Sequence, residues 1–330
     1  MIPRTTYLAK NLFANSIERI PTRHGYGEGV VAAANKNKNI VVLCADLTDS
    51  TKSRDFQKQF PERFVQVGVQ EQLLAASASG FALTGKIPYI TSYAMFCPGR
   101  AWEQIRTNLC LNNVNVKIIG SHAGVSVGPD GATHQAIEDI AIMRCIPNMT
   151  IIAPCDFHEA RKATIAISTY DGPCYVRYAR EKTPVFTTAK TPFKIGKALT
   201  LHSGRDVAII ACGPLVHNAL KVAHELRKEK IGVMVVNSHT IKPLDEKAIL
   251  QAAQMCGAIV TVEEHQITGG LGGAIAEFLA KTYPVPMEFI GVPNQFGETG
   301  EPMELIEHFG MGVSHIKNAV KKVLHRKQNH

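Results

Sequence analysis

This sequence contains eight short apolar runs, which are separated by longer segments with helical periodicity. The runs are rich in Val and Ile, do not alternate polar with apolar residues, and often end in a polar residue. They span residues 40–44, 116–119, 150–153, 174–178, 207–211, 233–236, 258–262 and 287–290. Strands buried on both faces of a parallel sheet show this pattern. The sequence therefore predicts an α/β protein in which strands and helices alternate.

The segments between the runs define the predicted helices and one domain boundary. Helical pattern covers Glu71–Leu83, Trp102–Leu111, Ala136–Met143, Asp156–Ser168, Leu215–Arg227 and Leu271–Ala280. Residues 181–192 are rich in threonine, contain two prolines and have little apolar content, which is typical of a linker. We predict two domains, residues 1–185 and 193–330, each a mostly parallel sheet flanked by helices.

The hydrophobic content and net charge of the chain indicate a globular protein that does not bind nucleic acid. The chain has 330 residues, of which 45% are hydrophobic and 19% charged, so there is enough apolar material for two packed cores. The net charge of +8 is spread along the chain, and its dense cluster at residues 317–327 lacks the aromatic side chains of a nucleic-acid site. We interpret that cluster as the solvated face of a final helix and expect no nucleic-acid partner.

Membrane association and secretion are not expected either. The apolar runs fall far short of the ~18 residues that a membrane span needs. The first twenty residues carry charged side chains and lack the apolar core of a secretory signal. The eight cysteines are far apart with no Cys-x-x-Cys, so neither a disulfide framework nor a zinc site is indicated. We therefore expect a cytoplasmic protein with free, mostly buried thiols.

A glycine-rich loop at residues 269–273 follows one predicted strand and opens a helix. Such a loop can hold a phosphate at a helix N-terminus. The spacing Gly-x-Gly-x-x-Gly fails, however, because Ile275 stands at the third glycine position. A tight turn is therefore the favoured interpretation.

Groups that can handle protons gather in residues 122–135, directly after a predicted strand. His122, Asp130 and His134 lie there together with three glycines. The carboxyl end of a strand is the usual place for ligand groups in an open α/β sheet, and imidazole and carboxylate groups act as general acids and bases. Taken singly, each histidine is more often structural, so the local pattern leaves both interpretations open.

Three further residues are ambiguous on local grounds. Glu71 opens a predicted helix, where a carboxylate either caps the helix or does chemistry. Tyr93 and Phe96 lie just after the strand-like residues 88–91, and core packing is their ordinary role.

Five motifs in fixed order resemble the C-terminal half of transketolase, the thiamine diphosphate-dependent ketol transferase. They are Ala45-Asp-Leu47, Gly68-Val-Gln-Glu-Gln72, Gly128-Pro-Asp-Gly-Ala-Thr-His-Gln135, Pro147-Asn-Met149 and Ala153-Pro-Cys-Asp156. The combination is specific for the wider group that also holds deoxyxylulose-phosphate synthase and 2-oxo acid dehydrogenase beta subunits. The resemblance runs from about Thr22 to the end and implies a pyrimidine-binding domain followed by a transketolase C-terminal domain.

The resemblance implies four cofactor-binding residues. Glu71 is the carboxylate that faces N1′ of the aminopyrimidine, where a shared proton promotes the imino tautomer that deprotonates the thiazolium C2. Phe96 stacks on the pyrimidine, with Tyr93 beside it, and Asp46 lies near the cofactor at a subunit interface. A third aromatic residue of the family falls near Gly99 here, so that wall of the pocket departs from the family.

The resemblance also implies which residues act on the sugar. His134 contacts the donor's oxygens at the reacting centre, and Asp130 binds the C2 hydroxyl of the aldose acceptor. His122 acts on sugar hydroxyls or on the phosphate end. Glu71, His134 and His122 are therefore the implied catalytic residues.

Three more residues match the positions that hold the substrate phosphate, namely Arg23, Ser50 and Arg180. Guanidinium groups suit that role because their planar donors pair bidentately with phosphate oxygens. The presence of all three favours a phosphorylated sugar over a 2-oxo acid.

One motif of the family is missing. Thiamine diphosphate enzymes hold the diphosphate through Mg²⁺ on a Gly-Asp-Gly motif followed by an Asn, and no Gly-Asp-Gly occurs in this chain. The diphosphate still needs oxygen ligands around its metal. We therefore expect no metal ligands in this chain and a partner N-terminal subunit that carries the diphosphate and Mg²⁺ site, in a heterotetramer with two copies of each chain.

The resulting prediction is the C-terminal subunit of a split transketolase of the pentose phosphate pathway. It would transfer a two-carbon ketol unit from a ketose phosphate to an aldose phosphate and be active only with its partner subunit. The alternative is a 2-oxo acid dehydrogenase beta subunit or a deoxyxylulose-phosphate synthase-like subunit. A catalytically silent regulatory or nucleic-acid-binding protein is disfavoured, because the motifs around Glu71 and His134 are intact.

Overall fold

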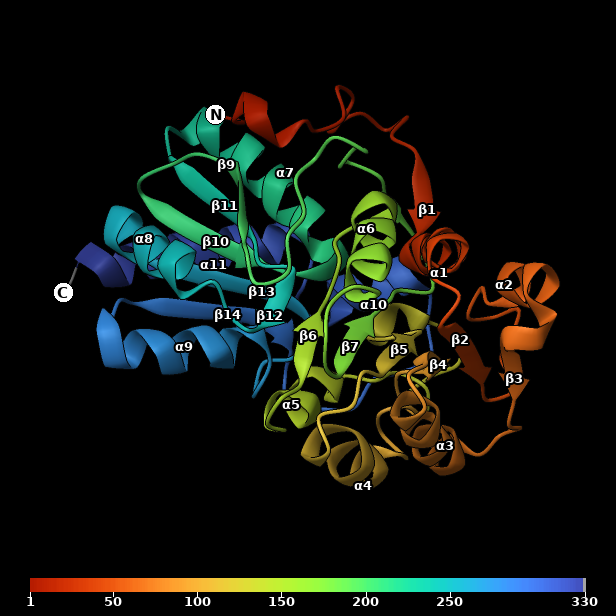
Figure 1. Cartoon of the computed structure of the whole chain (residues 1–330). Helices are drawn as coiled ribbons and strands as arrows, with labels where there is room; N and C mark the ends of the chain where they lie inside the picture. Colours follow the sequence, from red (N-terminus) through yellow and green to blue (C-terminus); the bar gives the residue numbers. More distant parts are fainter. Residues whose placement is uncertain (329–330) are drawn as a thin grey trace.

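The computed structural model describes residues 1–328 and contains two mostly parallel sheets that lie next to each other (Figure 1). The first sheet has seven strands in the order β12-β6-β7-β5-β4-β2-β3. Their bounds are β2 Ile40–Cys44, β3 Phe64–Gln66, β4 Ile87–Tyr93, β5 Lys117–Ser121, β6 Thr150–Ile152, β7 Cys174–Arg177 and β12 Thr240–Lys242. Six of these strands run parallel, and β12 pairs with β6 in the antiparallel sense.

Helices cover both faces of this sheet, because its strands are apolar on both sides. On one face, α1 (Thr22–Lys36) and α6 (Phe157–Ile167) pack together over a core of buried side chains. The other face carries α3 (Glu71–Leu83), a helical segment made of α4 (Trp102–Gln104) and the π-helical η3 (Ile105–Leu111), and α5 (Asp139–Arg144). The shorter elements are α2 (Arg54–Gln59), η2 (Pro61–Arg63) and η4 (Val125–Val127).

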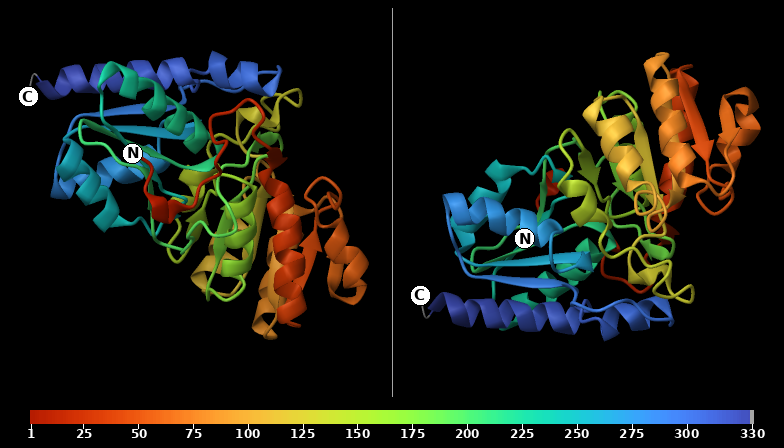
Figure 2. Two further views of the ribbon diagram at one scale, coloured as in Figure 1. Left: turned by 90° about the horizontal axis from the view of Figure 1, so that it is seen from above. Right: turned by 90° about the horizontal axis from the view of Figure 1, so that it is seen from below.

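The second sheet has five strands in the order β14-β13-β10-β11-β9 and is also covered on both faces (Figure 2). Its strands are β9 Leu199–His202, β10 Val207–Ala211, β11 Val233–Asn237, β13 Ile259–Gln266 and β14 Met287–Val292. Helices α7 (Val216–Leu226) and α11 (Val313–Gln328) cover one face, and α8 (Glu246–Cys256) and α9 (Leu271–Thr282) the other. The remaining elements are η5 Gly213–Leu215, η6 Arg227–Glu229 and α10 Pro302–His308.

Several segments tie the two halves of the chain together. Strand β12 comes from the second half of the sequence but extends the first sheet. Strand β1 (Arg19–Pro21) pairs with β8 (Lys182–Pro184), which lies inside the predicted linker. The N-terminal segment, with η1 (Arg4–Thr6), packs on the second half, where Leu12 joins its core. The domain limits 1–185 and 193–330 remain a prediction, across which these contacts reach.

The predicted elements are found in the structure with small shifts at their ends. All eight apolar runs contain a strand, and the α/β class is confirmed. The predicted helix 136–143 begins only at Asp139, because residues 136–138 belong to the polar loop that precedes it. Strand β3 was not predicted from the sequence, since three partly exposed residues give too short an apolar signal.

The basic cluster near the C-terminus lies on α11, as predicted, and much of it is neutralised locally. Lys317 and Lys321 pair with Glu229, while Lys322 and Arg326 pair with Glu288. All eight cysteines are free, and seven of them are buried. Within residues 1–328, no helix is both long and apolar enough to cross a membrane.

The glycine-rich loop forms a tight turn whose anion position is already filled by the chain itself. Gly269 has a φ of +83°, in the left-handed region that favours glycine. The backbone N–H groups of Leu271 and Gly272 donate to the carboxylate of Glu263, at 2.7 and 2.8 Å. That carboxylate occupies the place where a phosphate would sit at the N-terminus of α9. The favoured interpretation of this loop is therefore confirmed.

Candidate active site

The candidate site lies at the carboxyl edge of the seven-stranded sheet. Parallel strands all end on this edge, which brings together residues that are far apart in the sequence. The predicted residues are Asp46 and Ser50 after β2, Glu71 after β3, Tyr93 and Phe96 at the end of β4, His122, Asp130 and His134 after β5, and Arg180 after β7. Arg23 reaches the same edge from the first turn of α1.

Glu71 is the first residue of α3, and its side chain is buried at 1% exposure. Its Oε2 accepts a hydrogen bond from Nη1 of Arg100 at 2.8 Å, while Ser92 Oγ lies 3.5 Å from Oε1. A buried carboxylate needs such partners, because burial without them is costly. The Arg100 side chain is 51% exposed, so this ion pair links a buried carboxylate to a guanidinium at the surface.

Four aromatic rings lie in contact with one another at this edge of the sheet. Tyr93 stacks on His122 with their ring centroids 3.8 Å apart, and lies 6.0 Å from the ring of Phe96. His134 meets the edge of Phe96 at 5.2 Å. The guanidinium of Arg100 lies over the face of Phe96, 4.8 Å from its centroid. The structure thus brings together the predicted aromatic residues and both predicted histidines.

His122 is held as a neutral imidazole. Its Nε2 lies 3.1 Å from Nη1 of Arg23, and because a guanidinium only donates, Nε2 must accept. The proton is then on Nδ1, which donates to Ser121 Oγ at 2.8 Å. Burial, with Arg23 and Arg180 nearby, lowers the pKa of His122 to about 2.

The two predicted phosphate-binding arginines converge beside His122. Arg23 donates to the backbone carbonyl of Ser50 at 2.9 Å, and its Nε is buried with no acceptor within residues 1–328. Arg180 donates to the carbonyl of Val127 and lies 3.9 Å from the carboxylate of Asp130. Burial and the neighbouring Arg180 lower the pKa of Arg23. Two cations held this close to each other favour an anion between them.

Two further positions bear on the predicted cofactor pocket: Asp46, a predicted site residue, and Gly99, where the family has an aromatic residue. Asp46 is exposed, and its backbone N–H donates to Oε1 of Gln66 at 2.7 Å, so β2 and β3 are joined there. A Cβ on Gly99 would lie 2.0 Å from the carbonyl oxygen of Met95. The turn that carries Phe96 and Arg100 therefore requires glycine at this position, and a third aromatic ring has no room in it.

A cavity of about 790 Å³ opens between Phe96, Arg100 and His134. Asp139 also lines this cavity, and its buried Oδ1 has no partner among the described residues. The cavity therefore combines the aromatic face of Phe96, the Arg100 guanidinium that is hydrogen-bonded to the buried Glu71, and an unpaired acceptor. These groups fit a planar heterocycle that carries N–H donors, as an aminopyrimidine does.

The expectation that the metal ligands come from a partner subunit stays a prediction. Within residues 1–328, no group of three or more His, Cys, Asp or Glu side chains is placed to hold a metal ion.

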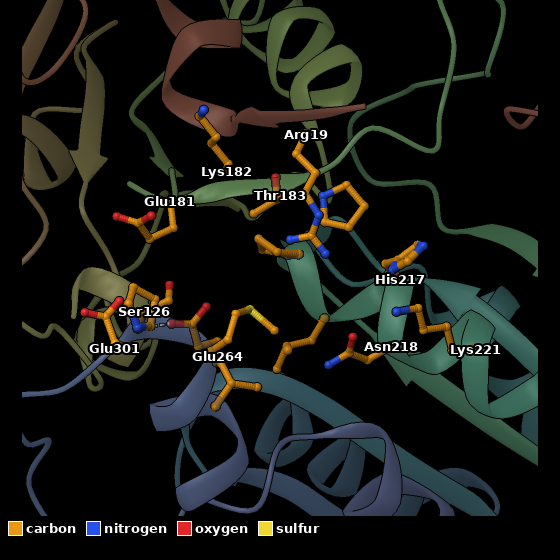
Figure 3. A pocket seen from close by; sticks show the side chains of 16 residues that line it. Arg19, Ser126, Glu181, Lys182, Thr183, His217, Asn218, Lys221, Glu264 and Glu301 are labelled. Atoms are coloured by element: carbon orange, nitrogen blue, oxygen red, sulfur yellow. Dashed lines mark hydrogen bonds between the residues drawn. The ribbon is translucent and has the colours of Figure 1, made fainter. Parts of the chain in front are cut away.

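A second cavity, of about 340 Å³, lies between the two halves of the chain (Figure 3). Strands β1 and β8, helix α7 and helix α10 line it, and Arg19 points into it from β1. At its edge, Glu264 accepts the backbone N–H of Ser126 at 2.7 Å, and burial raises the pKa of this carboxyl group. The predicted residues Phe96 and His134 line the larger cavity, which is therefore the candidate active site.

Arg100 is the residue at this site that the sequence did not reveal. It is one of many arginines in the sequence, and no local pattern indicates that it pairs with an acid 29 positions away. The only signal was a charged residue four positions after Phe96 in an otherwise uncharged stretch.

Comparisons with known proteins identify both halves of the chain. Residues 18–185 match the transketolase pyrimidine-binding domain, and residues 196–316 match the transketolase C-terminal domain. A "putative transketolase C-terminal section" from Methanocaldococcus jannaschii is 44% identical over 88% of this chain and 92% of its own length. A subunit of an apulose-4-phosphate transketolase from Phocaeicola vulgatus is 37% identical over 88% of this chain and 94% of its own.

Among solved structures, one described as "split gene transketolase, inactive beta4 tetramer" superimposes with a TM-score of 0.88. It is 41% identical, and the match covers 93% of this chain and 99% of that one. The similarity therefore extends over both sheets.

Proposed function

This chain belongs to the transketolase family, and from that premise we propose that it is the C-terminal subunit of a split transketolase. It transfers a two-carbon ketol unit from a ketose phosphate to an aldose phosphate. The pyrimidine-binding domain implies thiamine diphosphate as the cofactor. When bound, this cofactor supplies a nucleophilic carbon that carries the two-carbon unit.

The observation that carries the proposal is that one side chain, Arg100, contacts both the buried carboxylate of Glu71 and the ring of Phe96. Glu71 is fixed at the N-terminus of α3, and its Oε2 faces Arg100 at the cavity. In this position it can hold the proton at N1′ of an aminopyrimidine stacked on Phe96. Tyr93 supports Phe96 and His122 by stacking.

The sugar would lie between the histidines and the arginines. His134 is half-buried at the edge of Phe96 and shares a hydrogen bond with Thr133, which orients its ring. It can exchange protons with hydroxyl groups at the reacting carbon. Asp130 and the neutral His122 can bind further hydroxyls, and Arg23 and Arg180 bind the phosphate, with the unpaired Nε of Arg23 as one donor. Ser50 and Asp46 complete the edge of the site.

A partner N-terminal subunit would supply the diphosphate and Mg²⁺ site. Two relatives support this assignment, since one is named as a transketolase subunit and another as a C-terminal section. A similar split-gene protein is described as an inactive tetramer of beta chains, so this type of chain can associate with itself and lack activity when it does. We propose a heterotetramer in which each active site lies between the two kinds of chain.

The proposal is tested with the chain reconstituted with its partner, thiamine diphosphate and Mg²⁺. Glu71→Gln keeps the size of the side chain but removes the carboxylate, so kcat for ketol transfer is expected to fall about a hundredfold or more. Glu103→Gln, an exposed acid on α4, is the matched control. Assembly is followed by size-exclusion chromatography. Near-normal turnover by an assembled Glu71→Gln complex would remove Glu71 from its proposed role.

A further inference from the structure

Arg100 occupies the space between the two groups that the proposed function assigns to the aminopyrimidine. Its Nη1 lies 2.8 Å from Glu71 Oε2, and its guanidinium carbon lies 4.8 Å from the centroid of Phe96. A guanidinium is planar and carries N–H donors at its edge. It therefore makes the same two contacts as an aminopyrimidine, one with the carboxylate and one with the ring face.

We propose that Arg100 covers the Glu71 carboxylate and the face of Phe96 in the free chain, beside the open cavity, and must swing out before a pyrimidine can contact both groups. The inference rests on the proposed function, because it takes Glu71 and Phe96 as the pyrimidine site. Arg100 thereby becomes part of that site, and it moves toward solvent when the pyrimidine binds. Glu71 and the face of Phe96 become accessible only when another group takes over the hydrogen bond to Glu71.

The burial of the two partners decides which of them moves. Glu71 is 1% exposed, begins α3 and is held by Ser92, so its carboxylate stays in place. The Arg100 side chain is 51% exposed and stands in the turn before α4. Within residues 1–328, its guanidinium bonds to Glu71 and lies on Phe96, and nothing else anchors it. Its departure into solvent costs little beyond these two contacts.

When Arg100 moves away, Glu71 loses its partner, and this loss costs free energy. A buried carboxylate that loses its cation is strongly destabilised. A pyrimidine nitrogen that shares a proton with the carboxylate compensates for that loss. Replacement of the Arg100 guanidinium by an aminopyrimidine is therefore favourable. Movement of Arg100 into solvent without such a replacement is not. This coupling keeps the Glu71 carboxylate and the face of Phe96 covered until a suitable heterocycle is present.

The test uses the isolated chain and thiamine, which carries the aminopyrimidine but no diphosphate. Affinity is measured by ligand-detected NMR and isothermal titration calorimetry. Arg100→Met keeps an extended side chain but removes the charge and the donors, so thiamine is expected to bind about fivefold or more tightly than to the wild-type chain. Arg106→Met, at an exposed arginine on the next turn, is the matched control and is expected to match the wild type.

A double variant shows whether Arg100 acts through Glu71. In the Glu71→Gln background the ion pair is already absent, so Arg100→Met is expected to change thiamine affinity less than twofold. Far-ultraviolet circular dichroism and thermal unfolding confirm that each variant is folded.

The outcomes separate this inference from the proposed function. If Arg100→Met binds thiamine no more tightly than the wild type, Arg100 is not a competitor and the inference is overturned. If adding Glu71→Gln to Arg100→Met also leaves thiamine affinity unchanged, Glu71 does not contact the pyrimidine, the site itself is misplaced and the proposed function fails with it. A gain in Arg100→Met that disappears without Glu71 supports both.

Discussion

His122 shows how a residue's neighbours determine its chemistry. Its imidazole lies between Arg23, which donates to Nε2, and Ser121, which accepts from Nδ1. Burial and the nearby guanidinium groups lower the pKa of His122 to about 2, well below the ordinary 6.5. In the free chain it is therefore a neutral donor and acceptor rather than a source of protons, and in the proposed reaction we expect His134 to transfer the protons.

The neutral state of His122 can be measured directly. We expect its ¹⁵N chemical shifts to show the Nδ1–H tautomer with no titration between about pH 5 and pH 8. Because the folded pKa is below the unfolded one, His122 removes stability as the pH falls below about 6.5, where only the unfolded state takes up the proton. Arg23→Met should raise the pKa of His122, whereas the distant Arg205→Met should not. Titration of wild-type His122 near its ordinary pKa would contradict this assignment.

Arg180 gives a second prediction at this scale. If it binds the substrate phosphate, Arg180→Met in the reconstituted complex should raise KM for phosphorylated sugars about tenfold or more, since hydrogen bonds to charged groups contribute about 1.5–3 kcal/mol. The KM for an unphosphorylated ketose should stay the same. Lys182→Met, two residues away at the surface, is the control. Equal changes in KM for both kinds of sugar would assign Arg180 to another role.

At the scale of elements, the loop before α9 binds a carboxylate from the same chain, that of Glu263. The carboxylate of Glu263 accepts from the first N–H groups of α9, so the strand β13 and the helix are locked at this turn. A Cβ on Gly270 would lie 2.0 Å from Oε2 of Glu263. The glycine is needed for this close approach and not for binding a phosphate.

Two alanine substitutions test this explanation. Gly270→Ala should lower the free energy of unfolding by about 2 kcal/mol or more, because the methyl group displaces a buried carboxylate. At Gly273, inside α9, the nearest atom to a Cβ is Nη2 of Arg144 at 3.5 Å, which is an ordinary contact. Gly273→Ala should therefore be neutral or stabilising by up to about 1 kcal/mol. Urea denaturation measures both, and similar costs for the two variants would contradict the explanation.

At the scale of the whole molecule, a buried acid joins the two halves of the chain. Glu159 on α6 accepts from Nδ2 of Asn237 on β11 at 2.7 Å and from the backbone N–H of Cys155 at 2.7 Å. Burial nevertheless dominates and raises the pKa of Glu159 to about 7, from an ordinary value of 4.5. The folded chain thus takes up a proton here that the unfolded chain releases.

This uptake makes stability depend on pH. Between pH 4.5 and about 7 the folded state binds more protons than the unfolded state, so stability falls as pH rises, by up to ~3 kcal/mol over this range. Above about pH 7 this contribution is constant. In Glu159→Gln the fall in stability between pH 4.5 and about 7 should be smaller by that amount. The exposed Glu304→Gln should keep the wild-type dependence of stability on pH. Chemical denaturation at a series of pH values measures it, and parallel slopes for wild type and Glu159→Gln would refute the assignment.

The sequence by itself determined the strands of the eight apolar runs, most of the long helices and the family. Buried runs and helical periodicity are local properties, because each residue contributes to them through its own burial and its neighbours a few positions away. The ordered motifs around Glu71 and His134 added the site residues as expectations. Elements with weak local signals, such as β3 and the crossing strand β12, were not predicted.

Only the tertiary structure decided how these residues meet. The order of strands in the sheet sets which carboxyl ends are adjacent, and that order depends on packing over the whole chain. The bond from Arg100 to Glu71, the filling of the glycine loop by Glu263 and the neutral state of His122 all follow from it. Each is a contact between groups that are distant in sequence or a change of charge state caused by burial, and neither leaves a pattern along the chain.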